Sequence, residues 1–329
     1  MTMKLNPVFS NGCVFQAHKP IRVFGTGAGT ASVTMNGVTA NGVFDTENWL
    51  LELPAREYGG PYEMEIVLNG ERTTLADVYV GEVLLAGGQS NMELKLSETA
   101  YDASRCADDP LLRLYTVDKP GDGEFFASAD GWVKVTKENA PHFTALGYIA
   151  ARKIREAAGC AVGIIACYQG AAAIQAFLPE KVFEDKTLVI PEKERFDMQY
   201  PWNPGTSQLY HAMMERIAPY AIGCAVYYQG ESNCSEKESV IYGRLLERLI
   251  TCWRELFRDE KLHFIIVQIA DYLPRAGRPW ARIQQAQAQA DAWENVDTVV
   301  CRDICENDMI HPVHKEELAL RIAEKILCR

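Results

Sequence analysis

The pattern of apolar and polar residues changes once along the chain, near residue 78. Before it, short runs in which apolar and polar residues alternate are separated by Gly and Asn, which is typical of half-buried antiparallel strands. The Asn36-Gly37 pair between two such runs favours a two-residue hairpin turn. We therefore predict that residues 1–77 form a small β-sandwich of the jelly-roll or immunoglobulin-like type, with strands at 21–24, 31–35, 49–53 and 62–68.

From residue 78 onward, continuous apolar runs alternate with longer segments of helical period. This alternation predicts a doubly wound parallel sheet with helices on both faces, a three-layer α/β/α domain over residues 78–329. The predicted strands are 78–86, 111–117, 161–167, 222–228, 262–269 and 297–301. The predicted helices are 143–158, 208–217, 236–257, 279–293 and 313–327.

The first candidate for chemistry is Ser90, in the run Gly87-Gly88-Gln89-Ser90-Asn91-Met92. The run follows a predicted buried strand, and the glycine pair permits a tight turn with close approach of a ligand. A helix over 92–96 would place the Ser90 amide near a helix N-terminus, where it could stabilise an oxyanion. A purely structural turn is the alternative, because serine in Gly-rich loops often bonds the local backbone.

A second candidate is the segment Asp308 to Pro312, which supplies an acid and the imidazole of His311 in one short loop. An Asp near Nδ1 would fix the histidine tautomer and leave Nε2 free to accept the serine proton. Pro312 disfavours helix at His311, so a helix is expected to start just after it. The alternative is a helix-capping Asp beside a surface histidine.

Two further motifs follow predicted strands: Tyr168-Gln169-Gly170 and the segment 227–233, which contains Gln229. The carboxyl ends of parallel strands share one edge of a sheet, where sites form. The amides of Ser90 and Gly170 with the Gln229 side chain could therefore surround an oxyanion. Strand-ending glycine turns are the alternative for each motif.

Taken together, these motifs resemble those of the sialate O-acetylesterases, a branch of the SGNH (GDSL-like) hydrolases. The match covers nearly the whole chain: GGQSNM, a block similar to WYQGESN with Tyr227 in the Trp position, and a final DxxHP. The resemblance implies an SGNH-hydrolase-like, flavodoxin-like sheet. It also implies Ser90 as nucleophile, His311 as general base, Asp308 as its orienting acid, and Gly170 and Gln229 as oxyanion donors.

One block departs from the family pattern, and this departure concerns the substrate. The family's GGTPxEAW is here Gly170 to Phe177, without the hydroxyl, acid and indole. Sialic acid is anionic, so an arginine such as Arg275, Arg278 or Arg282 would be needed to bind its carboxylate, although solvated surface charges are the alternative. The segment 178–207 is expected to be a loop near the site. Further candidates for support or substrate binding are Gln89, Asn91, Glu231, Gln268 and, in that loop, Tyr200, Trp202 and Asn203.

We therefore predict a serine esterase that removes O-acetyl groups from sugars, most readily sialic acid, through an acetyl-serine intermediate, with no metal or organic cofactor. An acetylxylan or other polysaccharide acetylesterase is the alternative within enzymes. A catalytically weak carbohydrate-binding protein is the alternative outside them. The sequence leaves open the sugar, the hydroxyl position, the role of the sandwich, and whether Glu231 or Asp303 assists His311.

The resemblance implies a small-molecule or oligosaccharide acetyl ester as partner, and composition argues against two other partner classes. A formal net charge of −11 argues against nucleic acid and anionic membrane surfaces, and no apolar run is long enough for a bilayer. The first residues lack an apolar signal core, so a cytoplasmic protein is expected, with a removed signal as the alternative. Ten cysteines without a CxxC pair suggest reduced, mostly buried thiols. Whether the chain forms a homo-oligomer stays open.

Overall fold

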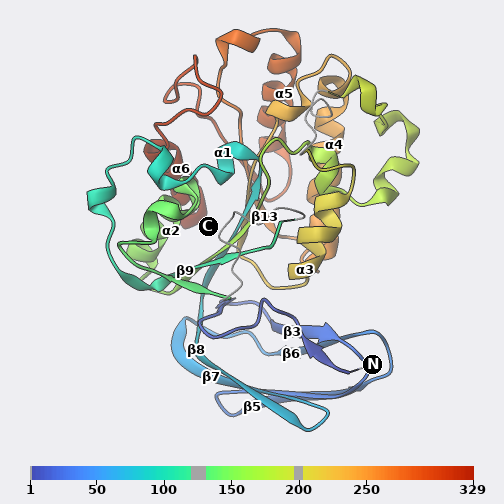
Figure 1. Cartoon of the computed structure of the whole chain (residues 1–329), viewed down its shortest axis with the longest axis vertical. Coiled ribbons are helices and arrows are strands. Elements are labelled where there is room, and N and C mark those ends of the chain that lie inside the picture. Colours follow the sequence, from blue (N-terminus) through green and yellow to red (C-terminus); the bar gives the residue numbers. More distant parts are fainter. Residues whose placement is uncertain (1, 120–130, 196–202) are drawn as a thin grey trace.

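One long strand, β8 (Glu71–Gly88), runs through both parts of the molecule (Figure 1). The computed structural model describes residues 2–119, 131–195 and 203–329. The first half of β8 pairs antiparallel with β7 (Gly59–Leu68) in the small N-terminal part. Its second half is the centre of the parallel sheet. The predicted division between residues 77 and 78 thus falls inside a single strand, whose apolar residues are buried by both parts.

The N-terminal part is a sandwich of two antiparallel layers. One layer holds β1, β3 and β6, and the other holds β4, β5, β7 and the start of β8. Asn36 and Gly37 have φ values of 48° and 76°, which is the left-handed turn that the hairpin prediction requires. Trp49 is buried between the layers. The remaining bounds are β1 (Lys4–Leu5), β2 (Val14–Gln16), β3 (Ile21–Thr26), β4 (Gly29–Met35), β5 (Val38–Phe44) and β6 (Asn48–Leu53).

The second part is built on a sheet with the order β10-β9-β11-β8-β12-β13-β14. All neighbours on this path are parallel except the edge pair β10 and β9. The fold class predicted from the alternating pattern is confirmed, and each of the six predicted strands has a counterpart. Their bounds are β9 (Asp109–Thr116), β10 (Val133–Val135), β11 (Val162–Tyr168), β12 (Cys224–Tyr228), β13 (His263–Val267) and β14 (Val296–Val299).

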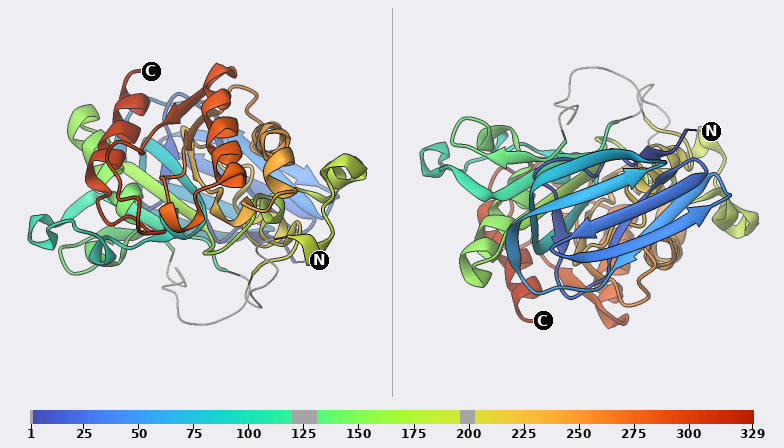
Figure 2. Two further views of the ribbon diagram at one scale, coloured as in Figure 1. Left: turned by 90° about the horizontal axis from the view of Figure 1, so that it is seen from above. Right: turned by 90° about the horizontal axis from the view of Figure 1, so that it is seen from below.

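Helices cover both faces of this sheet (Figures 1 and 2). One face carries α2 (Ala145–Ala158) and α6 (Glu316–Leu327), and the other carries α4 (Glu238–Leu256) and α5 (Arg278–Gln289). Two short helices are α1 (Ser90–Glu93) and α3 (Glu215–Ile217). Single turns are η1 (Leu96–Glu98), η2 (Ala103–Arg105), η3 (Ala140–His142), η4 (Ile174–Phe177), η5 (Glu180–Glu184), η6 (Lys186–Leu188), η7 (Glu192–Glu194), the π-turn η9 (Tyr210–Met214), η10 (Glu231–Asn233), η11 (Leu273–Arg275) and η12 (Ala290–Ala292).

The helix predicted over 92–96 was misplaced. The structure has α1 from Ser90 to Glu93, so the serine is the first residue of the helix instead of preceding it by two positions. The chain then leaves the helix because Leu94 becomes extended and Lys95 forms a bridge with Thr144. Thr144 also accepts a hydrogen bond from the Gly147 amide, which caps α2.

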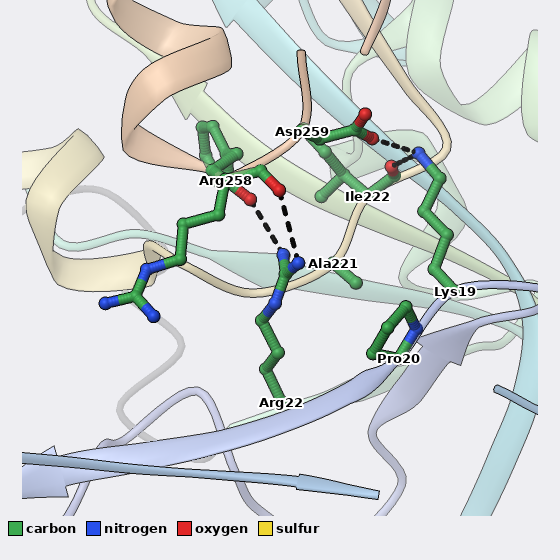
Figure 3. A pocket seen from close by; sticks show the side chains of 8 residues that line it. Lys19, Pro20, Arg22, Ala221, Ile222, Arg258 and Asp259 are labelled. Atoms are coloured by element: carbon green, nitrogen blue, oxygen red, sulfur yellow. Dashed lines mark hydrogen bonds and ion pairs between the residues drawn. The ribbon is translucent and has the colours of Figure 1, made fainter. Parts of the chain in front are cut away.

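Two cations of the sandwich fix it to the α/β domain (Figure 3). Lys19 Nζ lies 2.6 Å from Asp259 Oδ2 and 2.7 Å from the Ile222 carbonyl. Arg22 donates to the carbonyls of Phe257 and Arg258 at 2.8 and 3.2 Å. The two cations line a pocket between the sandwich and the α/β domain. Since both already have protein partners, this pocket is a structural junction.

The described residues also bear on the cysteine and membrane predictions. All ten cysteines fall within the described ranges as free thiols, and seven of them are buried, as predicted for unpaired core cysteines. Within the same ranges, each helix is too short or too polar to span a bilayer.

Candidate active site

Three strand ends converge at the carboxyl edge of the sheet. Strand β8 lies between β11 and β12, so the loops that carry Ser90, Gly170 and Gln229 are neighbours. Gly88 permits this proximity: its φ is 130°, and a Cβ at this position would lie 2.1 Å from the Tyr228 carbonyl oxygen. A larger residue would push β8 and β12 apart just before the serine, which explains the glycine in the first motif.

Ser90 and His311 meet at this edge although 221 residues separate them. The Ser90 Oγ and His311 Nε2 atoms are 2.8 Å apart, which is hydrogen-bond distance. The pKa of His311 is lowered from its ordinary value, chiefly because burial disfavours the charged ring and then because the Lys315 cation lies nearby; Glu98 and Glu93 oppose this. The imidazole is therefore neutral at pH 7 and can accept the serine proton.

Asp308 makes no hydrogen bond with His311 in this structure. Its side chain is exposed, and among the described residues His311 has a hydrogen bond only to Ser90. The short loop that was predicted to bring Asp308 to Nδ1 is instead held by its Ile310 carbonyl, which accepts from Asn91. The role of Asp308 as the acid that orients His311 stays a prediction. Asp303 is also remote from this role, because it forms an exposed ion pair with Arg321.

The Gly170 amide lies beside the nucleophile but is already engaged. A Cβ on Gly170 would be 3.9 Å from Ser90 Cβ, and the Gly170 N–H donates to Glu93 Oε2 at 2.7 Å. The other Glu93 oxygen pairs with the largely buried Lys119. By contrast, the described residues include no acceptor for the Ser90 N–H. Glu93 was not identified from sequence, and no spacing rule marks it.

Gln229 lies in a buried hydrogen-bond network. Its side-chain amide donates to Asn233 Oδ1 at 2.8 Å, to the Ala172 carbonyl at 3.1 Å and to Gln89 Oε1 at 3.2 Å. Since an amide has two N–H groups, these acceptors use its whole donor capacity. The structure thus gives Gln229 a role in joining loops, and Gln89, also buried, is the partner that connects the network to the serine loop.

Asn91 connects the serine loop to the histidine loop. Its Nδ2 donates to Glu231 Oε1 at 2.6 Å and to the Ile310 carbonyl at 3.0 Å, while Oδ1 accepts from Lys315 Nζ at 2.8 Å. Burial raises the pKa of Glu231, whose second oxygen is buried without a hydrogen bond among the described residues. Glu231 therefore contacts Asn91 and does not assist His311 directly. Lys315 was missed by the sequence analysis.

The predicted substrate contacts divide into three groups. Gln268 is buried and donates to the Gln284 carbonyl of α5, so it packs a helix on the sheet. Arg275 ends η11, and Arg282 pairs with Glu236. Trp202 and Tyr200 lie outside the described residues, so the aromatic-loop prediction stays a prediction. No group of three potential metal ligands occurs within the described ranges.

Comparison with known proteins places the chain in a family. Residues 80–328 match the family described as "Carbohydrate esterase, sialic acid-specific acetylesterase". The chain belongs to this family. The match covers every motif discussed above, from the serine loop to the histidine loop, and confirms the resemblance noted from sequence.

Individual relatives of this family are distant in sequence. The chain is 26% identical to sialate O-acetylesterase of Homo sapiens, over 91% of this chain and 65% of that protein, and 25% identical to the Rattus norvegicus enzyme, over 91% and 68%. It therefore spans about two thirds of their length. The structure is also similar to that of a carbohydrate acetylesterase from Xanthomonas citri, with a TM-score of 0.85, 28% identity, and coverage of 98% of this chain and 74% of that one.

Proposed function

We propose that this chain is a carbohydrate acetylesterase in which Ser90 is the nucleophile and His311 the general base. The observation that carries the proposal is the 2.8 Å contact between Ser90 Oγ and His311 Nε2. His311 takes the hydroxyl proton as Oγ attacks the ester carbonyl, and it returns the proton to the departing sugar oxygen. Water then attacks the acetyl-serine by the same route and releases acetate.

The oxyanion of each step needs hydrogen-bond donors near the serine. The Ser90 N–H has no acceptor among the described residues, and the Gly170 N–H becomes available once Glu93 is displaced. We propose these two amides as the donors. The engaged Gln229 amide supports their loop.

The substrate class that the family favours is an O-acetylated sialic acid. Neutral acetylated sugars are a second candidate, and one observation supports them. Glu93 and Glu98 both lie near enough to His311 to act on its pKa. Carboxylates at this position disfavour an anionic sugar unless a cation compensates.

The test of the mechanism is Ser90→Ala with 4-nitrophenyl acetate as substrate. Removal of the nucleophile should lower kcat by at least about 10⁴-fold with an unchanged melting temperature. Ser97→Ala, which alters an exposed serine in η1, is the matched control and should behave as the wild type. Wild-type turnover by Ser90→Ala would refute the proposal.

The substrate class is tested by the acetate released from a matched set of acetylated sugars. Acetylated sialic acid and acetylated xylo-oligosaccharide should be compared by kcat/KM, with Ser90→Ala as the blank. A higher kcat/KM for the neutral sugar would indicate that the carboxylates near His311 contribute to substrate specificity. A preference for sialate would require a cation that offsets Glu93 and Glu98.

A further inference from the structure

Lys315 is a buried cation close to the Ser90–His311 pair. It is 1% exposed, and its Nζ lies 2.8 Å from Asn91 Oδ1 and 5.1 Å from the centre of the Tyr228 ring. Removing an ammonium from water is unfavourable, and this burial lowers the pKa of Lys315. An ammonium has three N–H donors, but among the described residues only Asn91 accepts from it. Because its burial is unfavourable, stability does not explain why a lysine occupies this position.

The hydrogen bond from Lys315 decides which way the Asn91 amide faces. With its oxygen directed at the cation, the amide nitrogen faces the Ile310 carbonyl, 3.0 Å away, and Glu231. The reverse orientation would place an N–H against the ammonium and an oxygen against the Ile310 oxygen. A cation at this place therefore selects one orientation.

This amide joins the two reacting residues through the chain. Asn91 follows Ser90 directly, and Ile310 directly precedes His311. Because His311 Nδ1 has no carboxylate partner among the described residues, the ring is positioned through its backbone. The clamp from Asn91 to Ile310 is the contact that holds that backbone against the serine loop.

We propose that Lys315 is a positioning residue for the Ser90–His311 pair: its ammonium orients the Asn91 amide, which holds the backbone beside His311 against the serine loop. The inference rests on the proposed function, in which His311 is the base. It adds a residue that touches neither substrate nor nucleophile.

The charged groups around His311 predict the direction in which its pKa should move in each variant. Lys315 acts to lower the pKa of His311, whereas Glu93 of α1 and Glu98 of η1 act to raise it. The base must be neutral, so activity is lost as pH falls through this pKa. Removing the cation should raise the pKa and move the acid limb of kcat/KM to higher pH. Removing the Glu98 charge should move it to lower pH.

Other ionisable groups face Lys315 itself. These are Glu231 after β12, and Cys301, Cys305 and Glu306 in the loop after β14, all of which favour its charged form. Loss of the lysine leaves Glu231 without its nearest cation, and Glu231 then favours its neutral form further, because burial already raises its pKa.

The experiment compares Lys315→Met, Lys315→Gln and Glu98→Gln in pH profiles of kcat/KM, with Lys137→Met as the control for loss of an exposed lysine. Lys315→Met should lower kcat roughly tenfold through misplacement of the ring and move the acid limb to higher pH. Lys315→Gln, which keeps an N–H donor, should show the same direction of shift with a smaller loss of kcat. It replaces the Met variant if that variant does not fold.

Two results would overturn the inference. One is a folded Lys315→Met with the wild-type kcat and acid limb. The other is a lower kcat with an unmoved acid limb, which would indicate a purely structural role. Ser90→Ala in the same series separates the two hypotheses. If it is inactive while Lys315→Met equals the wild type, only this inference fails, whereas turnover by Ser90→Ala refutes the proposed function.

Discussion

The two halves of the candidate site use their hydrogen bonds differently. On the side of proton transfer, Ser90 and His311 are already in contact at 2.8 Å. On the side of the oxyanion, the Gly170 N–H is held by the Glu93 carboxylate and the Gln229 amide by three acceptors of its own loops. One half is assembled in the free protein, and the other would have to release a contact before it could act as proposed.

This difference indicates that part of the substrate binding energy would be used to displace Glu93 from the Gly170 amide. A charge-assisted hydrogen bond such as that from Gly170 to Glu93 is stronger than one to a neutral ester carbonyl. For the Gly170 amide to act as the proposed oxyanion donor, the substrate must displace Glu93, and the negative charge that develops in the transition state competes for this amide better than the ground-state carbonyl does. The following predictions test each element of this contrast.

The largest effect is expected for Gln229→Ala. The change removes the buried hydrogen bonds to Gln89, Asn233 and the Ala172 carbonyl, so the free energy of unfolding should fall by about 3 kcal/mol. The kcat of the folded enzyme should fall by less than about tenfold. Loss of a direct oxyanion donor would instead lower kcat by about 10²- to 10³-fold. Urea unfolding measures the structural role of Gln229, and kcat measures its catalytic role. Gln285→Ala, which changes an exposed glutamine, is the control for both.

A smaller effect of opposite sign is expected for Glu93→Gln. The Gln side chain has one oxygen where Glu93 has two, so it can accept from only one of Gly170 and Lys119 in their present positions. It also carries no charge, so the substrate displaces it more easily. At a pH above the His311 pKa, kcat/KM should rise about fivefold, which corresponds to roughly 1 kcal/mol. A decrease under the same conditions would show that Glu93 helps the reaction and does not obstruct Gly170.

The smallest effect is expected for Asp308→Asn. Its exposed side chain makes no hydrogen bond with His311 in the structure, so kcat should change less than about threefold. An Asp that orients the imidazole would cost about 10⁴-fold when replaced by Asn. A loss of that size, at constant melting temperature, would show that substrate binding draws Asp308 to Nδ1.

The sequence predicted the parts of the molecule that depend on local pattern. Strands of the parallel sheet are uninterrupted apolar runs, and the ends of β8, β11 and β12 place Ser90, Gly170 and Gln229 at one edge because of the strand order. The pairing of Ser90 with His311 followed from the motifs and the family resemblance.

The remaining features depend on side-chain partners that no period encodes. Glu93 and Lys315 lack any motif of their own, and their roles arise from distances to Gly170 and Asn91. For Asp308, chain proximity suggested a contact with the ring, but the path of the loop is set by the clamp on Ile310. The short α1 has a similar cause, since a bridge to Thr144 ends it early.

The continuity of β8 limits how the sandwich could serve the enzyme. Strand β8 belongs to both sheets, and Lys19 and Arg22 bond the sandwich to the α/β domain. The two parts therefore have no hinge between them. The sandwich therefore keeps one position relative to Ser90, in contrast to a domain on a flexible tether.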